Sequence, residues 1–81
     1  MYTTYVLRSE KDGNLYVGCT SNLEKRLDMH NKGKVPSTKS RQPLKLVYSE
    51  SFSYRHEAFF AEKFYKTAKG KKVLLRKINN S

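Results

Sequence analysis

Residues 14–33, NLYVGCTSNLEKRLDMHNKG, restrict the fold more than any other part of the chain. Residues 15–20 are rich in aromatic and β-branched side chains, which are typical of a strand. Ser21 and Glu24 have the spacing of a capping box, which marks a helix start. Gly33 is a typical residue to follow a helix C-terminus. The segment therefore predicts a strand that passes directly into a helix.

One face of this predicted helix carries an unexpected pair of polar residues. Leu23, Arg26, Leu27 and His30 follow the i, i+3, i+4, i+7 spacing of a single helix face. Arg26 and His30 could simply edge the apolar stripe, with the arginine extending its charged end to water. Alternatively, they could belong to a functional site beside the core.

Two further strands are predicted. Residues 2–8 (YTTYVLR) are β-rich, and the following Asp12-Gly13 pair is a hairpin turn signal that leads into the strand at 15–20. Residues 44–52 alternate apolar and polar side chains, so this strand is expected to bury one face, which carries Leu44, Leu46 and Tyr48.

A loop and two helices are predicted for the remainder of the chain. Residues 34–43 contain two prolines and form the loop. Ser53 is expected to cap a helix over residues 54–68, Gly70 to break it, and residues 71–78 to form a short basic helix. The order is strand, strand, helix, strand, helix, helix. The predicted fold is α+β, with a small three-stranded, mainly antiparallel sheet flanked by helices, and residues 1–81 form a single domain.

Charge and composition narrow the class of partner. The chain has 17 Lys and Arg against 7 Asp and Glu, a formal net charge of +10, which favours nucleic acid first and anionic membrane second. No apolar run approaches the ~20 residues of a membrane span, and the polar N-terminus does not read as a signal peptide. A lone cysteine, Cys19, makes no intrachain disulfide and no cysteine-based zinc site, so a cytoplasmic location is expected.

The residue types needed for phosphodiester cleavage are all present. A carboxylate such as Glu62 can hold Mg²⁺ or Mn²⁺, an arginine fork suits a phosphate, and a tyrosine or histidine can move a proton. Each residue also has a simpler interpretation. Tyr5 and Tyr16 could be ordinary strand aromatics, and Glu62 could pair with Lys66 at i+4 on a solvated helix face.

Four segments in the same order carry a family resemblance: TTYVL, LYVGCTSNLEKRLDMHNKG, RQPLKLVYSESF and EAFFAEKFYK. The most specific element is YVG followed by arginine eight residues after the glycine and histidine four residues later. The chain resembles the GIY-YIG nuclease domain, in particular its small single-domain bacterial branch. The first name-giving motif is degenerate, because Thr3-Thr4-Tyr5 keeps only the tyrosine.

The resemblance implies a role for five residues. Tyr5 would help to activate the attacking water, and Tyr16 would line the site beside the water or phosphate. Arg26 would stabilise charge on the phosphate. His30 would take a proton from Tyr5. Glu62 would bind the single divalent metal, Mg²⁺ or Mn²⁺.

The resemblance also bears on three further positions. Gly18 matches the glycine of the second motif, where the backbone lies close to the helix start. Glu57 competes with Glu62 as metal ligand, but the EAFFAE spacing favours Glu62 and leaves Glu57 near a helix N-terminus, where the dipole favours a carboxylate. Many relatives have an asparagine roughly a dozen residues after the metal glutamate. In this chain that position falls near Leu74, so no residue is assigned to the role of the asparagine.

The predicted function is a metal-dependent endonuclease that hydrolyses nucleic acid, DNA in preference to RNA, by activated water. One alternative is a non-catalytic nucleic-acid-binding module of the same fold that acts with a partner protein. A small basic RNA-associated protein is a third hypothesis, which explains only the charge. Candidate phosphate-contacting cations are Lys34, Lys39, Arg41, Lys45, Lys63, Lys66 and Lys69, with Lys71, Lys72, Arg76 and Lys77 extending the basic C-terminal end.

Overall fold

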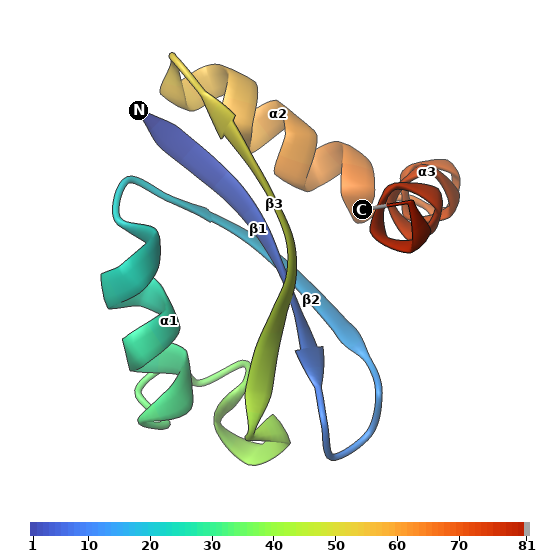
Figure 1. Ribbon diagram of the computed structural model, residues 1–81. Coiled ribbons are helices and arrows are strands. Elements are labelled where there is room, and N and C mark those ends of the chain that lie inside the picture. The colour runs from blue at the N-terminus through green and yellow to red at the C-terminus, as the bar shows by residue number, and fades with distance from the viewer. Residues whose placement is uncertain (81) are drawn as a thin grey trace.

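The computed structural model describes residues 1–80 and contains one sheet and three α-helices (Figure 1). The elements in chain order are β1 (Tyr2–Ser9), β2 (Leu15–Thr20), α1 (Leu23–Asn31), β3 (Leu44–Phe52), α2 (Arg55–Tyr65) and α3 (Ala68–Asn79), with a 3-10 turn at Lys39–Arg41. The predicted α+β class and element order are confirmed. Within residues 1–80, no helix is long and apolar enough to cross a membrane.

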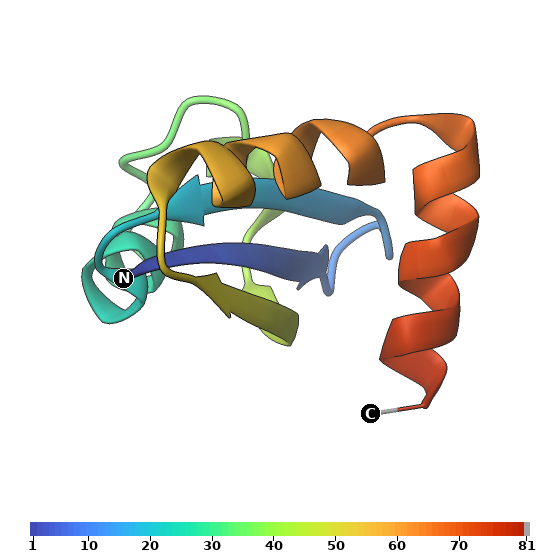
Figure 2. The same cartoon turned by 90° about the horizontal axis from the view of Figure 1, so that it is seen from above.

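The sheet has the order β2-β1-β3, and both pairings are antiparallel. The central strand β1 therefore sends alternate side chains to two separate apolar clusters. Tyr5 and Leu7 pack with Leu44 on the side of α1, whereas Val6 packs with Leu74 on the side of α2 and α3. Figure 1 shows α1 on one side of the sheet and the other two helices opposite. In Figure 2, α3 stands across the end of α2.

A β-bulge in β3 changes the predicted alternation. Val6 pairs with Tyr48, but the next residue, Leu7, pairs with Leu46, so Val47 is an extra residue on β3. Because of this insertion, Leu46 packs on the α1 side while Val47 and Tyr48 pack on the α2 and α3 side. The prediction that Tyr48 shares a face with Leu44 and Leu46 was wrong for this reason.

Two of the predicted helix caps are displaced by one residue. Asn22, rather than Ser21, is the N-cap of α1, and its side chain accepts a hydrogen bond from Lys25 N at 3.1 Å. Tyr54, rather than Ser53, is the N-cap of α2, and its backbone N–H donates to Glu57 Oε1 at 3.3 Å. Asparagine is as good an N-cap as serine, so the sequence alone does not separate Asn22 from Ser21.

The predicted stop at Gly33 is confirmed, because this glycine follows the C-cap of α1 and has a φ of +72°.

Gly70 does not break a helix as predicted. Helix α2 ends at Tyr65, and Gly70 lies in the first turn of α3, where its N–H donates to Thr67 Oγ1 at 3.0 Å. A methyl group at position 70 would overlap the carbonyl oxygen of Phe64. The glycine is therefore needed where the start of one helix presses against the end of the preceding helix.

Helix α3 is held to the sheet by a polar cluster. Lys77 Nζ donates to Glu50 Oε2 at 2.9 Å and to Tyr65 Oη at 2.7 Å. The hydrogen bond with Tyr65, followed by that with Glu50, raises the pKa of Lys77. The side chain of Lys77 is therefore bonded within the fold, to Glu50 of β3 and Tyr65 of α2.

Gly18 lies on β2 directly opposite Tyr5 of β1, and the tyrosine ring covers it. A methyl group at position 18 would lie 2.5 Å from Tyr5 Oη and 2.7 Å from Cζ. Strand β2 continues to Thr20 before α1 begins. Gly18 is therefore required by the ring of Tyr5, and not by contact with the helix start.

We expect Gly18→Ala to destabilise the fold by about 1–3 kcal/mol, the usual cost of overpacking a core, because the Tyr5 ring must move. Urea unfolding would measure the change. In a Tyr5→Leu background the added methyl meets no ring, so the same substitution should cost less than about 0.5 kcal/mol. An equal cost in both backgrounds would show that the ring is not the constraint.

Candidate active site

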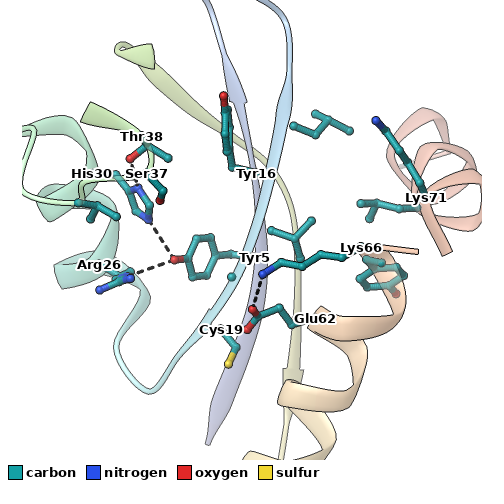
Figure 3. Close-up of a pocket in the computed structure, with 16 residues that line it drawn as sticks. Tyr5, Tyr16, Cys19, Arg26, His30, Ser37, Thr38, Glu62, Lys66 and Lys71 are labelled. Carbon is teal, nitrogen blue, oxygen red and sulfur yellow. Dashed lines mark hydrogen bonds and ion pairs between the residues drawn. The ribbon is translucent and has the colours of Figure 1, made fainter. Parts of the chain in front are cut away.

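A groove of about 500 Å³ follows the edge strand β2, and all five residues predicted to be catalytic line it. Alternate residues of β2 face opposite sides of the sheet, and both sets contribute to the groove. Side chains from α1 and from α2 therefore meet across the sheet edge, as Figure 3 shows. The residues concerned are Tyr5, Tyr16, Arg26, His30 and Glu62.

The hydroxyl of Tyr5 is the point at which two of these side chains meet. Its oxygen lies 3.0 Å from His30 Nε2, and Arg26 Nε donates to it at 3.2 Å. Tyr5 is only 2% exposed, and its ring meets that of His30 edge to face. The polar residues on the leucine side of α1 therefore converge on a buried phenol.

His30 is held by a second hydrogen bond through its other ring nitrogen. Its Nδ1 lies 2.7 Å from Oγ1 of Thr38, which sits at the start of the 3-10 turn. The imidazole is 4% exposed, and burial lowers its pKa, with a further contribution from the charge of Arg26. The lowered pKa favours the neutral imidazole, in which one ring nitrogen carries no hydrogen and can accept a proton.

Sequence reasoning missed Thr38. It lies in the segment 34–43, which was predicted only as a loop. The fold positions it through backbone hydrogen bonds, because its N–H donates to Val35 O at 3.1 Å and its carbonyl accepts from Arg41 N at 2.9 Å. A buried histidine needs a partner for each ring nitrogen, but the sequence does not specify which loop hydroxyl supplies it.

Glu62 enters the groove from α2. Its side chain is 16% exposed and pairs with Lys66 Nζ at 2.8 Å (Figure 3). Cys19 lies beside it, and the pKa of the thiol is raised first by burial and then by its hydrogen bond to the Glu62 carboxylate and the carboxylate charge. The structure thus brings the predicted metal ligand to the same groove as the Tyr5 hydroxyl.

The donor set of the groove fits a magnesium-like ion. Glu62 is the one carboxylate among the lining residues, and residues 1–80 contain no cluster of three His, Cys, Asp or Glu suited to a metal. Mg²⁺ usually keeps several waters and binds proteins through one or two carboxylates plus substrate phosphate. A single glutamate at the rim of a basic groove meets that requirement.

The competing carboxylate lies elsewhere. Glu57 is in the first turn of α2, bonded to the Tyr54 backbone, and lines a separate hollow with Phe52 and Phe60. Leu74, which stands near the position where the resemblance would place an asparagine, is 1% exposed and contributes only apolar surface to the groove.

Six of the seven candidate phosphate-contacting cations lie outside the groove. Of the seven, only Lys66 lines it. Arg41 pairs with Asp12 at 3.3 Å, and Lys63 covers the ring of Phe59 at 4.7 Å from its centroid. The others outside the groove are Lys34, Lys39, Lys45 and Lys69.

Lys71 of α3 does line the groove, although the sequence did not separate it from its basic neighbours. The available signal was its i, i+3 spacing from Leu74, which places both on the inner edge of the same helix.

Comparisons with known proteins agree with this architecture. The family model described as the GIY-YIG catalytic domain matches residues 1–79. A UPF0213 protein of Bacillus licheniformis is 52% identical over 63 residues, which are 76% of this chain and 64% of that protein. The UPF0213 protein YazA of Bacillus subtilis is 41% identical over 80 residues, covering 95% of this chain and 80% of the relative.

A solved structure also matches. The solution structure of a UPF0213 protein from Bacillus halodurans is 30% identical, with a TM-score of 0.58, and the match covers 94% of this chain and 84% of that one. The family model spans nearly the whole chain, and the YazA match covers four-fifths of that relative's length. The chain therefore belongs to the GIY-YIG family, among the bacterial UPF0213 proteins.

Proposed function

We propose that this protein is a metal-dependent endonuclease that hydrolyses phosphodiester bonds by activated water. The observation that carries the proposal is the Tyr5 hydroxyl, bonded to both Arg26 and His30, in the groove that also contains Glu62. This combination offers a proton acceptor, a cation and a carboxylate within one cavity. Family membership supports a nuclease in general terms, and the residue roles below develop those that the resemblance implies.

Tyr5 and His30 form a proton relay in this mechanism. Arg26 Nε–H already donates to the phenol oxygen, so the phenol directs its own hydrogen to His30 Nε2. As water attacks phosphorus, its proton passes to Tyr5 Oη while the phenolic proton passes to His30 Nε2. The bond from phosphorus to the leaving oxygen breaks, and that oxygen takes a proton from solvent. Nδ1–H donates to Thr38 throughout and fixes the ring.

Charge on the phosphate is balanced from both sides of the groove. Arg26 uses Nε for Tyr5, which leaves the two terminal NH₂ groups of its guanidinium for phosphate oxygens. Glu62 would hold Mg²⁺ or Mn²⁺ once Lys66, which pairs with it in the structure, is displaced from the carboxylate. A bound divalent ion would supply further stabilisation of charge on the phosphate and leaving oxygen.

The substrate we propose is nucleic acid, with DNA favoured over RNA. The formal charge of +10 supplies non-specific attraction to the phosphate backbone, and a cytoplasmic location would be consistent with such a substrate. A partner protein would provide targeting, because phosphate contacts carry no sequence information.

The first test is cleavage of labelled DNA by purified protein with Mg²⁺ or Mn²⁺. Glu62→Gln and Tyr5→Phe should each lower kcat by at least about 100-fold, because they remove the metal-binding carboxylate and the proton relay. Glu57→Gln is the matched control and should retain activity, since glutamine can keep the cap of α2. Chelation with EDTA should abolish cleavage by the wild type.

Equal cleavage by Glu62→Gln and wild type would end this assignment. Tight DNA binding that needs no metal, with no product over hours, would instead favour the non-catalytic binding module.

The second test is the pH dependence of kcat/KM. Acid protonates His30, which then cannot accept a proton from Tyr5, so activity should be lost as pH falls. Because burial lowers the pKa of His30 below its ordinary value of 6.5, the acidic limb should lie below pH 6.5. His56→Gln, which changes the exposed histidine outside the groove, should leave the limb unchanged. A limb above pH 6.5 would contradict the relay.

A further inference from the structure

One phenylalanine of α2 is exposed beside the proposed cleavage groove. Phe59 is 48% exposed, although phenylalanine is among the residue types most often buried. Helix periodicity places it on the same side of α2 as Glu62, three residues later, and Lys66, seven residues later. Those two residues pair with each other at the wall of the groove (Figure 3). The proposed hydrolytic mechanism gives the ring of Phe59 no role.

Positive charge borders this ring. Lys63 Nζ lies 4.7 Å from the ring centroid of Phe59. Arg55 is exposed and stands four residues before Phe59, on the same side of the helix. This side, which we call the groove side of α2, consists of Arg55, Phe59, Glu62, Lys63 and Lys66. It therefore carries three cations and one carboxylate around a single aromatic ring.

The neighbouring phenylalanine of α2 has different surroundings. Phe60 is 75% exposed, and it lines the separate hollow that includes Phe52 and His56. Among residues 1–80, no lysine or arginine lines that hollow. Phe59 and Phe60 are thus two exposed rings on one helix, of which only Phe59 lies on the groove side among cations.

An exposed ring among cations suits single-stranded nucleic acid. Bases stack on the aromatic ring, while the backbone phosphates contact the cations. The contact of Lys63 with Phe59 is no obstacle, because an exposed cation–π interaction is weak beside base stacking. Residues three apart on a helix have Cβ atoms about 5–6 Å apart. A base on Phe59 would therefore belong to a nucleotide close to the phosphate bound at Glu62.

We propose that Phe59 is a base-stacking residue for the substrate. An unpaired base near the scissile phosphate stacks on its ring, and Lys63 moves from the ring to a backbone phosphate. The substrate would then be single-stranded, or locally unpaired, where it passes α2. This inference rests on the proposed function for the identity of its ligand. It assigns to Phe59 a positioning role, with no part in proton transfer or metal binding.

The first test uses tryptophan fluorescence, because the chain contains no tryptophan of its own. Phe59→Trp and Phe60→Trp place the same indole at neighbouring positions on two sides of α2. Each variant is titrated with a short single-stranded oligodeoxynucleotide in EDTA, so that binding is measured without cleavage. The emission of Phe59→Trp should fall at least about twofold at saturation, because a base stacks against the indole. The emission of Phe60→Trp should stay unchanged.

The second test measures the affinity of a fluorescein-labelled single strand by anisotropy, also in EDTA. Phe59→Ala should weaken binding at least about fivefold, the lower end of the effect of losing one base–aromatic stack. Phe60→Ala removes a more exposed ring from the same helix and should leave the affinity unchanged. Alanine is a strong helix former, so α2 is retained in both variants, and urea unfolding checks this.

Equal quenching of the two tryptophan variants would overturn the inference. So would an unquenched Phe59→Trp at saturation, or a Phe59→Ala protein that binds like Phe60→Ala. A lower oligomeric mass of Phe59→Ala in light scattering, with unchanged affinity for the oligonucleotide, would instead assign the ring to a contact between copies of the chain.

Failure of this inference is distinguishable from failure of the proposed function. Quenching and weakened binding that depend on Phe59, with no cleavage under any metal condition, would retain the stacking residue and remove the nuclease. Metal-dependent cleavage, with a Phe59→Ala protein that binds and cleaves like Phe60→Ala, would do the reverse.

Discussion

The position of the Tyr5 ring over Gly18 is the constraint on which the rest of the site depends. The ring can cross β2 only because position 18 lacks a side chain. That crossing carries the hydroxyl to the edge of the sheet, where it meets Arg26 and His30 of α1. The hydrogen bonds of the hydroxyl give two buried or half-buried polar residues partners that they would otherwise lack. A larger residue at position 18 would therefore disturb packing and chemistry together.

The edge strand also explains how two sides of the sheet contribute to one groove. Tyr16 and Gly18 face α1, whereas the neighbouring residues of β2 face α2 and α3. Glu62 reaches the groove from the second side, and the Tyr5 hydroxyl reaches it from the first. A central strand could not do this, because both of its edges are paired. The site is therefore a consequence of the sheet order β2-β1-β3 as well as of the residues.

The sequence was sufficient for the strands and the element order, and the motifs it shares with the family pointed to five of the residues that line the groove. Periodicity specifies elements well, because each residue contributes to the same pattern. It failed at the bulge of Val47 and at Gly70, where a single residue changes the face of a strand or presses against a carbonyl. Neither the bulge nor the close approach of Gly70 to the Phe64 carbonyl has a local sequence signature. Thr38 was missed because loop geometry, rather than spacing, brings it to His30.

The state of the His30 ring tests the account most directly. In the proposed relay the imidazole is neutral at pH 7, with its proton on Nδ1 towards Thr38 and a bare Nε2 towards Tyr5. Long-range ¹H–¹⁵N NMR of the histidine ring reports both the tautomer and the pKa. The account predicts the Nδ1–H tautomer and a pKa below 6.5. A ring that is charged at pH 7, or one that carries its proton on Nε2, would contradict the account.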